Sequence, residues 1–187
     1  GNVKPNPMVG CVIVNNGRII GEGFHRKYGE DHAEVIAIHS VKEKELLRRS
    51  VLYVNLEPCS HFGKTPPCSD LILDHKIPKV IIGCKDSNER VSGKGIEKLR
   101  QNGCEVLSGI LEGESRELNK RFFTFHEKKR PYIILKWAQT LDGYIAKKEM
   151  GKGIKSQISS LNSQILSHKW RSEEQAIMVG TTTVVAD

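Results

Sequence analysis

The pattern of apolar and polar positions over the first 110 residues predicts five strands. Met8–Val14 and Arg18–Gly23 are apolar segments joined by Asn15-Asn16-Gly17, a turn sequence typical of a β-hairpin. Further apolar runs, rich in β-branched residues, predict three more strands over Val51–Leu56, Lys79–Cys84 and Glu105–Ile110.

Between and after these strands, apolar positions follow the period of a helix. They predict helices over residues 32–48, 67–76, 95–102 and 114–125. The resulting order is β-β-α-β-α-β-α-β-α. It indicates an α/β domain with a mixed sheet and helices on both faces.

The last third of the chain reads as the beginning of a second domain. Residues 126–131 (HEKKRP) are charged and end in Pro, which is typical of a linker. The following segment, YIILKWA (residues 132–138), predicts a strand, and Leu141-Asp142-Gly143 predicts a turn. We therefore divide the chain into one domain over residues 1–127 and part of another over residues 128–187.

The composition changes this picture only by narrowing the class of protein. The 187 residues are 38% hydrophobic, and no apolar run approaches the roughly 20 residues of a membrane span. The first residues lack the order of a signal peptide. Five cysteines are too few, and odd in number, for a secreted disulfide scaffold. We expect a cytoplasmic protein with no membrane partner; homo-oligomerisation is left open.

The formal charge of +7 raises the question of a nucleic-acid partner. Residues 1–127 carry 19 basic and 17 acidic side chains, whereas residues 128–187 carry 10 and 5. The basic excess therefore lies mainly in the second segment. A solvated surface explains such a dispersed surplus, and an anionic ligand is the alternative. We expect no nucleic-acid partner.

The candidate catalytic and metal-binding residues lie near the starts of two predicted helices in the first domain. His32 and Glu34 open one predicted helix, and Cys59 and Cys68 flank the turn before another. One imidazole and two thiolates supply three ligands of a tetrahedral zinc and leave the fourth position open for water, as in catalytic sites. Glu34, two residues after His32, is placed to move a proton without being a ligand.

Each of these residues also has an ordinary structural explanation. Asp31 and Glu34 together resemble a variant capping box, and His32 alone is an unremarkable helix residue. The two cysteines are also compatible with free thiols or with a closed structural zinc site. The remaining thiols lie in or beside apolar strands, where a small buried thiol is expected: Cys11, Cys84 and Cys104.

The joint pattern favours catalytic zinc. His-x-Glu followed by Pro-Cys and a further Cys is typical of zinc deaminases, although the two cysteines here are separated by eight residues instead of two. Within that loop, His61 and Lys64 are polar candidates for holding an anionic group. On the residues alone, a solvated lysine is the competing explanation for Lys64.

Longer strings now suggest a family. The chain resembles the bifunctional riboflavin biosynthesis deaminase/reductases from Asn2 to Asp187. The strings that carry the resemblance are PNPMVGCVIV, GEGFH, HAE, LYVNLEPCSHFGKTPPC, GKGIEKLR, LNKRFF, ILKWAQTLDG and VGTTTVVAD. The eight-residue cysteine spacing, with SHFGKTPP inside it, separates this family from transfer-RNA adenosine and cytidine deaminases.

The resemblance implies a cytidine deaminase-like three-layer α/β/α domain followed by the start of a dihydrofolate reductase-like α/β domain. It also implies two activities. The first domain would deaminate 2,5-diamino-6-ribosylamino-4(3H)-pyrimidinone 5′-phosphate, and the second, in the full-length protein, would reduce the ribosyl group to ribityl with NADPH.

By position, the resemblance implies a role for several residues. Zn²⁺ would be bound by His32, Cys59 and Cys68, with Glu34 as the catalytic proton shuttle. The substrate would be held by Asn6, His61, Lys64 and, in the reductase part, Arg171. The NADPH-contacting positions would be Ala138, Thr183 and Asp187. The family usually has the sequence Ser-x-Trp-Ile-Thr near this point, and here Gln157 replaces the Trp. The cofactor contacts over residues 155–157 therefore depart from the family pattern.

Two other classes of function remain open from the sequence. A nucleic-acid deaminase of the transfer-RNA adenosine type would bind RNA or DNA with strong salt dependence. A non-catalytic zinc interaction module would have a closed site with four protein ligands.

Overall fold

A computed structural model describes residues 3–63, 66–88, 91–145 and 158–186. The chain divides into two compact units, residues 2–132 and residues 133–187. No helix in the described part of the chain is long and apolar enough to cross a membrane.

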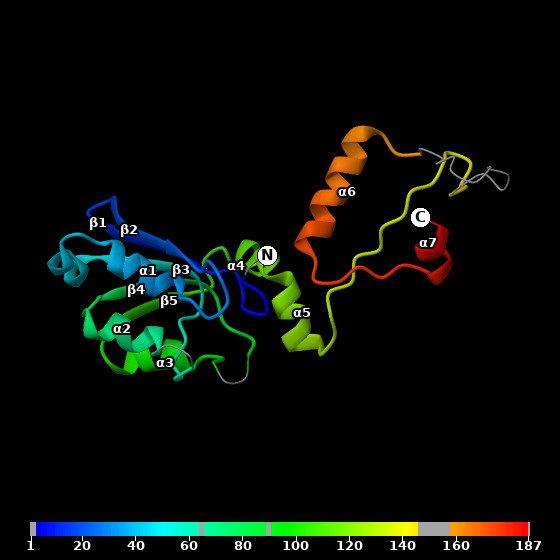
Figure 1. Ribbon diagram of the computed structural model, residues 1–187. Coiled ribbons are helices and arrows are strands. Elements are labelled where there is room, and N and C mark those ends of the chain that lie inside the picture. Colours follow the sequence, from blue (N-terminus) through cyan, green and yellow to red (C-terminus); the bar gives the residue numbers. More distant parts are fainter. Residues whose placement is uncertain (1–2, 64–65, 89–90, 146–157, 187) are drawn as a thin grey trace. The chain divides into compact units, whose positions relative to one another are not determined.

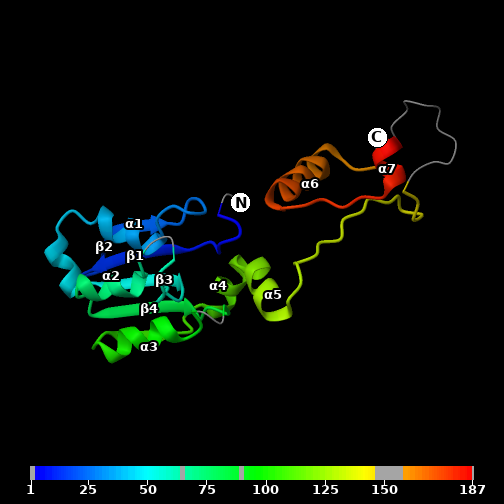
Figure 2. The ribbon, with the colours of Figure 1, turned by 60° about the horizontal axis from the view of Figure 1, so that its bottom comes forward.

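The first unit is built on a mixed five-stranded sheet in the order β2-β1-β3-β4-β5 (Figures 1 and 2). β1 runs antiparallel to both β2 and β3, and β3, β4 and β5 are parallel. The mixed sheet predicted from the sequence is therefore confirmed. The strands span Gly10–Asn15 (β1), Arg18–Phe24 (β2), Val51–Leu56 (β3), Lys79–Cys84 (β4) and Glu105–Ser108 (β5).

The predicted hairpin joins β1 to β2. Asn15 pairs with Arg18, so Asn16 and Gly17 form a two-residue turn with φ angles of 47° and 73°. A turn with two positive φ angles matches the right-handed twist of the strands, and Asn-Gly adopts it readily.

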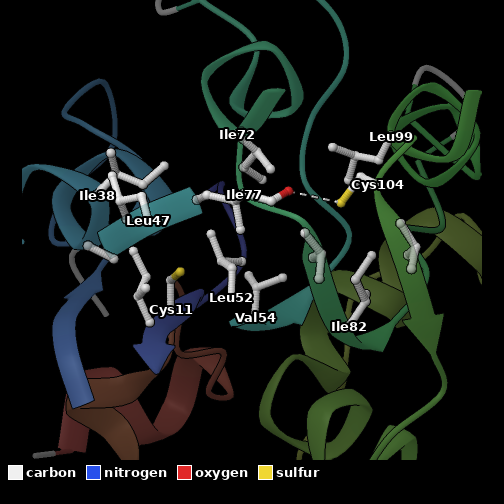
Figure 3. Close-up of a cluster of buried hydrophobic side chains, with 14 of the residues drawn as sticks. Cys11, Ile38, Leu47, Leu52, Val54, Ile72, Ile77, Ile82, Leu99 and Cys104 are labelled. Carbon is white, nitrogen blue, oxygen red and sulfur yellow. Dashed lines mark hydrogen bonds between the residues drawn. The ribbon is translucent and has the colours of Figure 1, made fainter. Parts of the chain in front are cut away.

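Three helices share one apolar core on one face of the sheet (Figure 3). They are α1 (Ala33–Ser40), α2 (Cys68–Asp74) and α3 (Lys94–Gln101). Alternate residues of each central strand point into this core, as the two-residue period of a strand requires. Figure 3 labels several core residues that are less than 1% exposed: Ile38, Leu47, Leu52, Ile72, Ile82 and Leu99.

Two glycines of β2 let α1 lie unusually close to the sheet. A Cβ at Gly23 would be 2.5 Å from both Ala33 O and Ala37 N, and one at Gly21 would be 2.6 Å from Ala37 O. Backbone atoms of α1 thus occupy the space that side chains would take. The GEGFH string therefore sets the position of the helix that begins beside His32.

The predicted helix over residues 32–48 is wrong as a single element. α1 ends at Ser40, and a separate 3₁₀-helix, η1, spans Lys44–Arg49. The Lys44 ammonium donates to the carbonyls of Ile38, His39 and Val41 at 2.7–2.9 Å. These carbonyls lie at the end of α1, where a cation is favourable, so Lys44 stabilises the break.

We expect Lys44→Met to lower the free energy of unfolding by about 1 kcal/mol, because charge-assisted bonds to the terminal carbonyls of α1 are lost. Urea unfolding at constant zinc concentration measures the change. Lys42→Met, which removes a neighbouring exposed lysine, serves as the control. Equal stability of the two variants would contradict a capping role for Lys44.

The predicted helix over residues 114–125 is also two elements. α4 (Glu112–Leu118) and α5 (Lys120–Lys128) are separated at Asn119, which is 3% exposed. The Asn119 side chain accepts a hydrogen bond from Met8 N at 2.7 Å and donates one to Met8 O at 2.8 Å. The backbone of Met8 is therefore held by a side chain, and β1 begins at Gly10 and not at Met8.

The helices α4 and α5 lie away from the core shared by the first three helices. A Cβ at Gly83 would be 2.3 Å from the Ser115 hydroxyl oxygen, so α4 approaches the sheet at the carboxyl end of β4. Farther along the same face, Tyr53 and Leu107 are 43% and 44% exposed. The second helical layer of residues 2–132 thus covers only one end of the sheet.

The second unit carries α6 (Leu161–Glu173) and α7 (Thr181–Ala186). The strand predicted over residues 132–138 is wrong, because this segment has no strand partner among the described residues, and an apolar run needs one to form a ladder. The turn is confirmed: Thr140 N donates a hydrogen bond to Tyr144 O at 2.8 Å, and Gly143 has a φ angle of 89°. The predicted linker 126–131 begins inside α5.

Candidate metal centre

Three candidate metal ligands come from the ends of three different elements. His32 immediately precedes α1, Cys59 follows the end of β3, and Cys68 is the first residue of α2. Helices α1 and α2 pack on the same face of the sheet and contribute to one core. The fold therefore brings together residues that are up to 36 positions apart in the sequence.

The ligand atoms of these residues lie within 4.8 Å of one another. His32 Nδ1 is 3.3 Å from Cys68 Sγ and 3.6 Å from Cys59 Sγ. Tetrahedral zinc bonded to one nitrogen and one sulfur holds those two atoms about 3.6 Å apart. The separations and the chemistry of the three side chains both fit zinc, and they form the His/Cys/Cys set typical of zinc deaminases.

The protonation of the metal-free site follows from its internal hydrogen bonds. The pKa of Cys59 is lowered to about 4, first by a hydrogen bond from Cys68 and also by one from His32. The pKa of Cys68 is raised, because its thiol donates to Cys59 and is buried. The pKa of His32 is raised by its hydrogen bond to Cys59. These hydrogen bonds therefore favour a thiolate at Cys59 and a protonated thiol at Cys68.

Glu34 lies in the first turn of α1 and is 3% exposed. Burial raises its pKa to about 7, and its side chain forms a hydrogen bond with Cys68. A carboxyl group with a pKa near neutrality is suited to accepting and returning a proton. The structure therefore places the predicted proton shuttle in contact with the ligand set.

Asn6 is connected to the ligand set through a residue that the sequence analysis did not single out. His25 is 5% exposed, and its Nε2 lies 3.0 Å from Asn6 Nδ2. Its Nδ1 lies 3.0 Å from Asp31 O, and its ring meets the His32 ring edge-on at 5.5 Å between centroids. The carbonyl can only accept, so His25 donates from Nδ1 and accepts at Nε2 from the Asn6 amide.

Asp86 is a second residue that the sequence analysis missed. It follows β4 and is 8% exposed, and Asn88 N donates to its Oδ1 at 2.6 Å. Burial, together with the negative charges of Glu57 and Cys59, raises its pKa to about 6. The available signal was its place at the carboxyl end of a buried parallel strand, where polar residues gather at sites in α/β folds.

Two other predicted residues lie in the loop between the cysteines. His61 is exposed on this loop. Lys64 falls outside the described residues. The structure therefore brings His32, Glu34, Cys59 and Cys68 together, and leaves the roles of His61 and Lys64 as predictions.

The predicted reductase residues belong to the unit of residues 133–187. Ala138 lines a hollow of about 480 Å³, whereas Arg171 on α6 and Thr183 on α7 are exposed and are not among its lining residues. Asp187 and residues 155–157 lie outside the described residues. The side chains that line the hollow with Ala138 include Lys136, Trp137, Ser163, Leu166 and Trp170.

Comparison with known proteins agrees with the zinc geometry. Residues 2–84 match the family described as the cytidine and deoxycytidylate deaminase zinc-binding region, and residues 131–187 match the RibD C-terminal domain. A diaminohydroxyphosphoribosylamino-pyrimidine deaminase from Buchnera aphidicola subsp. Schizaphis graminum is 53% identical over 120 residues, covering 64% of this chain and 80% of that protein. The riboflavin biosynthesis protein RibD of Aquifex aeolicus is 48% identical over 187 residues. This chain belongs to the RibD family.

The match to RibD proteins extends over both units. A diaminohydroxyphosphoribosylaminopyrimidine deaminase/5-amino-6-(5-phosphoribosylamino)uracil reductase from Thermotoga maritima has a TM-score of 0.90 and 46% identity, covering 100% of this chain and 52% of that one. The alignment with the Aquifex RibD covers 100% of this chain and 51% of that protein. The chain thus spans about half the length of these RibD relatives. The family resemblance and the cytidine deaminase-like α/β fold predicted from the motifs are confirmed.

Proposed function

We propose that residues 1–127 form a zinc-dependent deaminase domain that removes an amino group from a phosphorylated diaminopyrimidine. The observation that carries this proposal is the buried Glu34 carboxyl group beside the His32, Cys59 and Cys68 ligand set. A closed structural site needs a fourth protein ligand, and the group found among the described residues has three. The relatives named for diaminopyrimidine deamination support the choice of substrate.

Each residue of the centre has a task in this reaction. His32 Nδ1 and the two thiolates would hold the metal, which supplies a Lewis acid and lowers the pKa of a bound water to about 7. The Glu34 carboxylate accepts a proton from the attacking water and delivers it to the amino group, which leaves as ammonia. Its burial keeps bulk water from competing for that proton.

The substrate contacts extend this proposal to residues that the ligand set does not include. Asn6, oriented by His25, would hold the pyrimidine, with His61 beside it and Lys64 facing the phosphate. Because the ligand is a small anion, no nucleic-acid partner is required. The cytoplasmic location remains a prediction from the composition.

For residues 128–187 we propose a part in the NADPH-dependent reductase domain of the full-length protein. Ala138, Thr183 and Asp187 would contact NADPH there, and Arg171 would contact the substrate. The match of residues 131–187 to the RibD C-terminal domain supports this assignment.

Zinc analysis combined with an ammonia-release assay tests the deaminase proposal. Purified protein should contain one zinc per chain and release ammonia from 2,5-diamino-6-ribosylamino-4(3H)-pyrimidinone 5′-phosphate, with or without NADPH. Ammonia release from adenosine in transfer RNA, without release from the pyrimidine, would favour a nucleic-acid deaminase. Zinc without either activity would favour an interaction module.

Zinc binding is expected to tighten as the pH rises. The pKa values of Cys68 and His32 are raised, so both groups hold more tightly the protons that the metal must displace. For each displaced proton, the apparent affinity for zinc rises about tenfold with each unit of increasing pH, as long as the pH is below the pKa of the group. Competition with a chromogenic chelator between pH 6 and 8 measures this slope. An affinity independent of pH would show that both groups are already deprotonated.

A further inference from the structure

The side chain of Glu57 is a buried carboxylate that the proposed reaction does not use. It follows directly after β3, two residues before Cys59, and is 3% exposed. An isolated charge in such a place is unfavourable, so it needs hydrogen-bond partners. Four backbone N–H groups supply them, at 2.9–3.3 Å: those of Asp86, Gly93, Gly95 and Ile96.

These N–H groups belong to the segment that leads into α3. Gly95 and Ile96 lie in the first turn of the helix, where no helical carbonyl can accept from them, and both donate to Glu57 Oε1. Gly93, the residue before the helix, and Asp86 donate to Oε2. The N-cap position provides no side-chain hydrogen bond of its own. Glu57 therefore caps α3 from 36 to 39 residues away.

The backbone around Glu57 is held from two further directions. Glu57 N donates to Cys84 O at 3.0 Å, which ties the end of β3 to β4. A Cβ at Gly95 would be 2.1 Å from Pro58 O, so the start of α3 lies directly against the next peptide of the turn. Residues 57 and 58 are thus fixed between β4 and α3, and Cys59 follows immediately.

We propose that Glu57 is a positioning residue for the metal centre, which holds the turn that places Cys59 Sγ relative to His32 and Cys68. The charge of the side chain is required, because only a carboxylate offers acceptors at both oxygens. In Glu57→Gln, one end of the side chain becomes an NH₂ group and faces two N–H donors. The role depends on zinc binding as proposed above, but the geometry of the ligand set can be measured apart from catalysis.

The test compares Glu57→Gln with Leu99→Ala in the full 187-residue chain. Leu99 lies in the core under the same helix, so its truncation weakens α3 while leaving the carboxylate and its four partners in place. The readouts are zinc affinity by chelator competition and the visible absorption spectrum of the cobalt-substituted protein. Ammonia release, where present, gives kcat and KM separately.

Glu57→Gln is expected to bind zinc about 10- to 100-fold more weakly and to show an altered cobalt spectrum. Its kcat should fall about tenfold with KM changed less than twofold. Leu99→Ala should keep the wild-type spectrum and zinc affinity under conditions where it is folded. A Glu57→Gln variant with wild-type cobalt spectrum and zinc affinity would overturn the proposal.

Glu57→Asp keeps the experiment decisive if Glu57→Gln does not fold. It retains two acceptor oxygens on a side chain shorter by one methylene, and it should give zinc affinity between wild type and the values expected for Glu57→Gln. Wild-type affinity in Glu57→Asp, with Glu57→Gln unfolded, would assign the residue to folding alone. Failure of the wild-type chain to bind zinc would instead refute the proposed function.

Discussion

Glu34→Gln is expected to lower the rate of ammonia release about a thousandfold while zinc remains bound. The amide has nearly the shape of the carboxylate and fits the same buried position, but it cannot take up a proton. The ligand set is unchanged in this variant. Zinc content and steady-state ammonia release, measured on the same preparation, separate loss of catalysis from loss of metal.

The pH dependence of the wild type adds a second check on Glu34. Its pKa is raised to about 7 in the metal-free site, and the charge of bound zinc lowers it again. Since only the carboxylate accepts a proton, the rate should decline on the acid side, with a midpoint below pH 7. Glu45→Gln, at an exposed position on η1, is the control and should match the wild type. Undiminished ammonia release by Glu34→Gln would contradict its role as proton shuttle.

Gly23→Ala is expected to destabilise the protein by about 1–3 kcal/mol and to weaken zinc binding. The new Cβ would lie 2.5 Å from two backbone atoms of α1, so the helix must move away from β2. His32 and Glu34 move with it, because they lie at the start of that helix. Urea unfolding and chelator competition measure the two effects.

Gly10→Ala is the matched control for this glycine. Gly10 lies in β1, and a Cβ at this position would meet no atom within 4 Å. Gly10→Ala should therefore retain wild-type stability and zinc affinity. If Gly23→Ala behaves in the same way, the close approach of α1 to β2 does not set the position of the metal ligands.

Local sequence patterns predicted the sheet and the ligand set well, because both depend on short-range signals. Strand residues alternate or form β-branched runs, and the ligands follow recognisable turn sequences before helices. The single helix over residues 32–48 was wrong for an identifiable reason. Lys44 folds back onto the carbonyls of α1, and a lysine in a helical pattern carries no sign of such a contact.

The residues around the ligands were less predictable, since most of their partners are backbone groups that no side-chain pattern marks. Backbone N–H groups hold Glu57, and a backbone C=O holds His25 Nδ1; every residue carries a C=O, and every residue except proline carries an N–H. Only the fold shows which of these groups meet a given side chain. The strand predicted over residues 132–138 failed similarly, because an apolar run does not reveal whether a partner strand is available.

The capping of α3 by Glu57 also constrains the order in which the metal site can assemble during synthesis. The three metal ligands and Glu34 all lie between residues 32 and 68, so they leave the ribosome well before residues 93–96. Until those later residues arrive, the Glu57 carboxylate lacks most of its partners and favours water over the interior. The hydrogen bonds that hold the turn before Cys59 are therefore complete only after the chain has been made at least as far as Ile96.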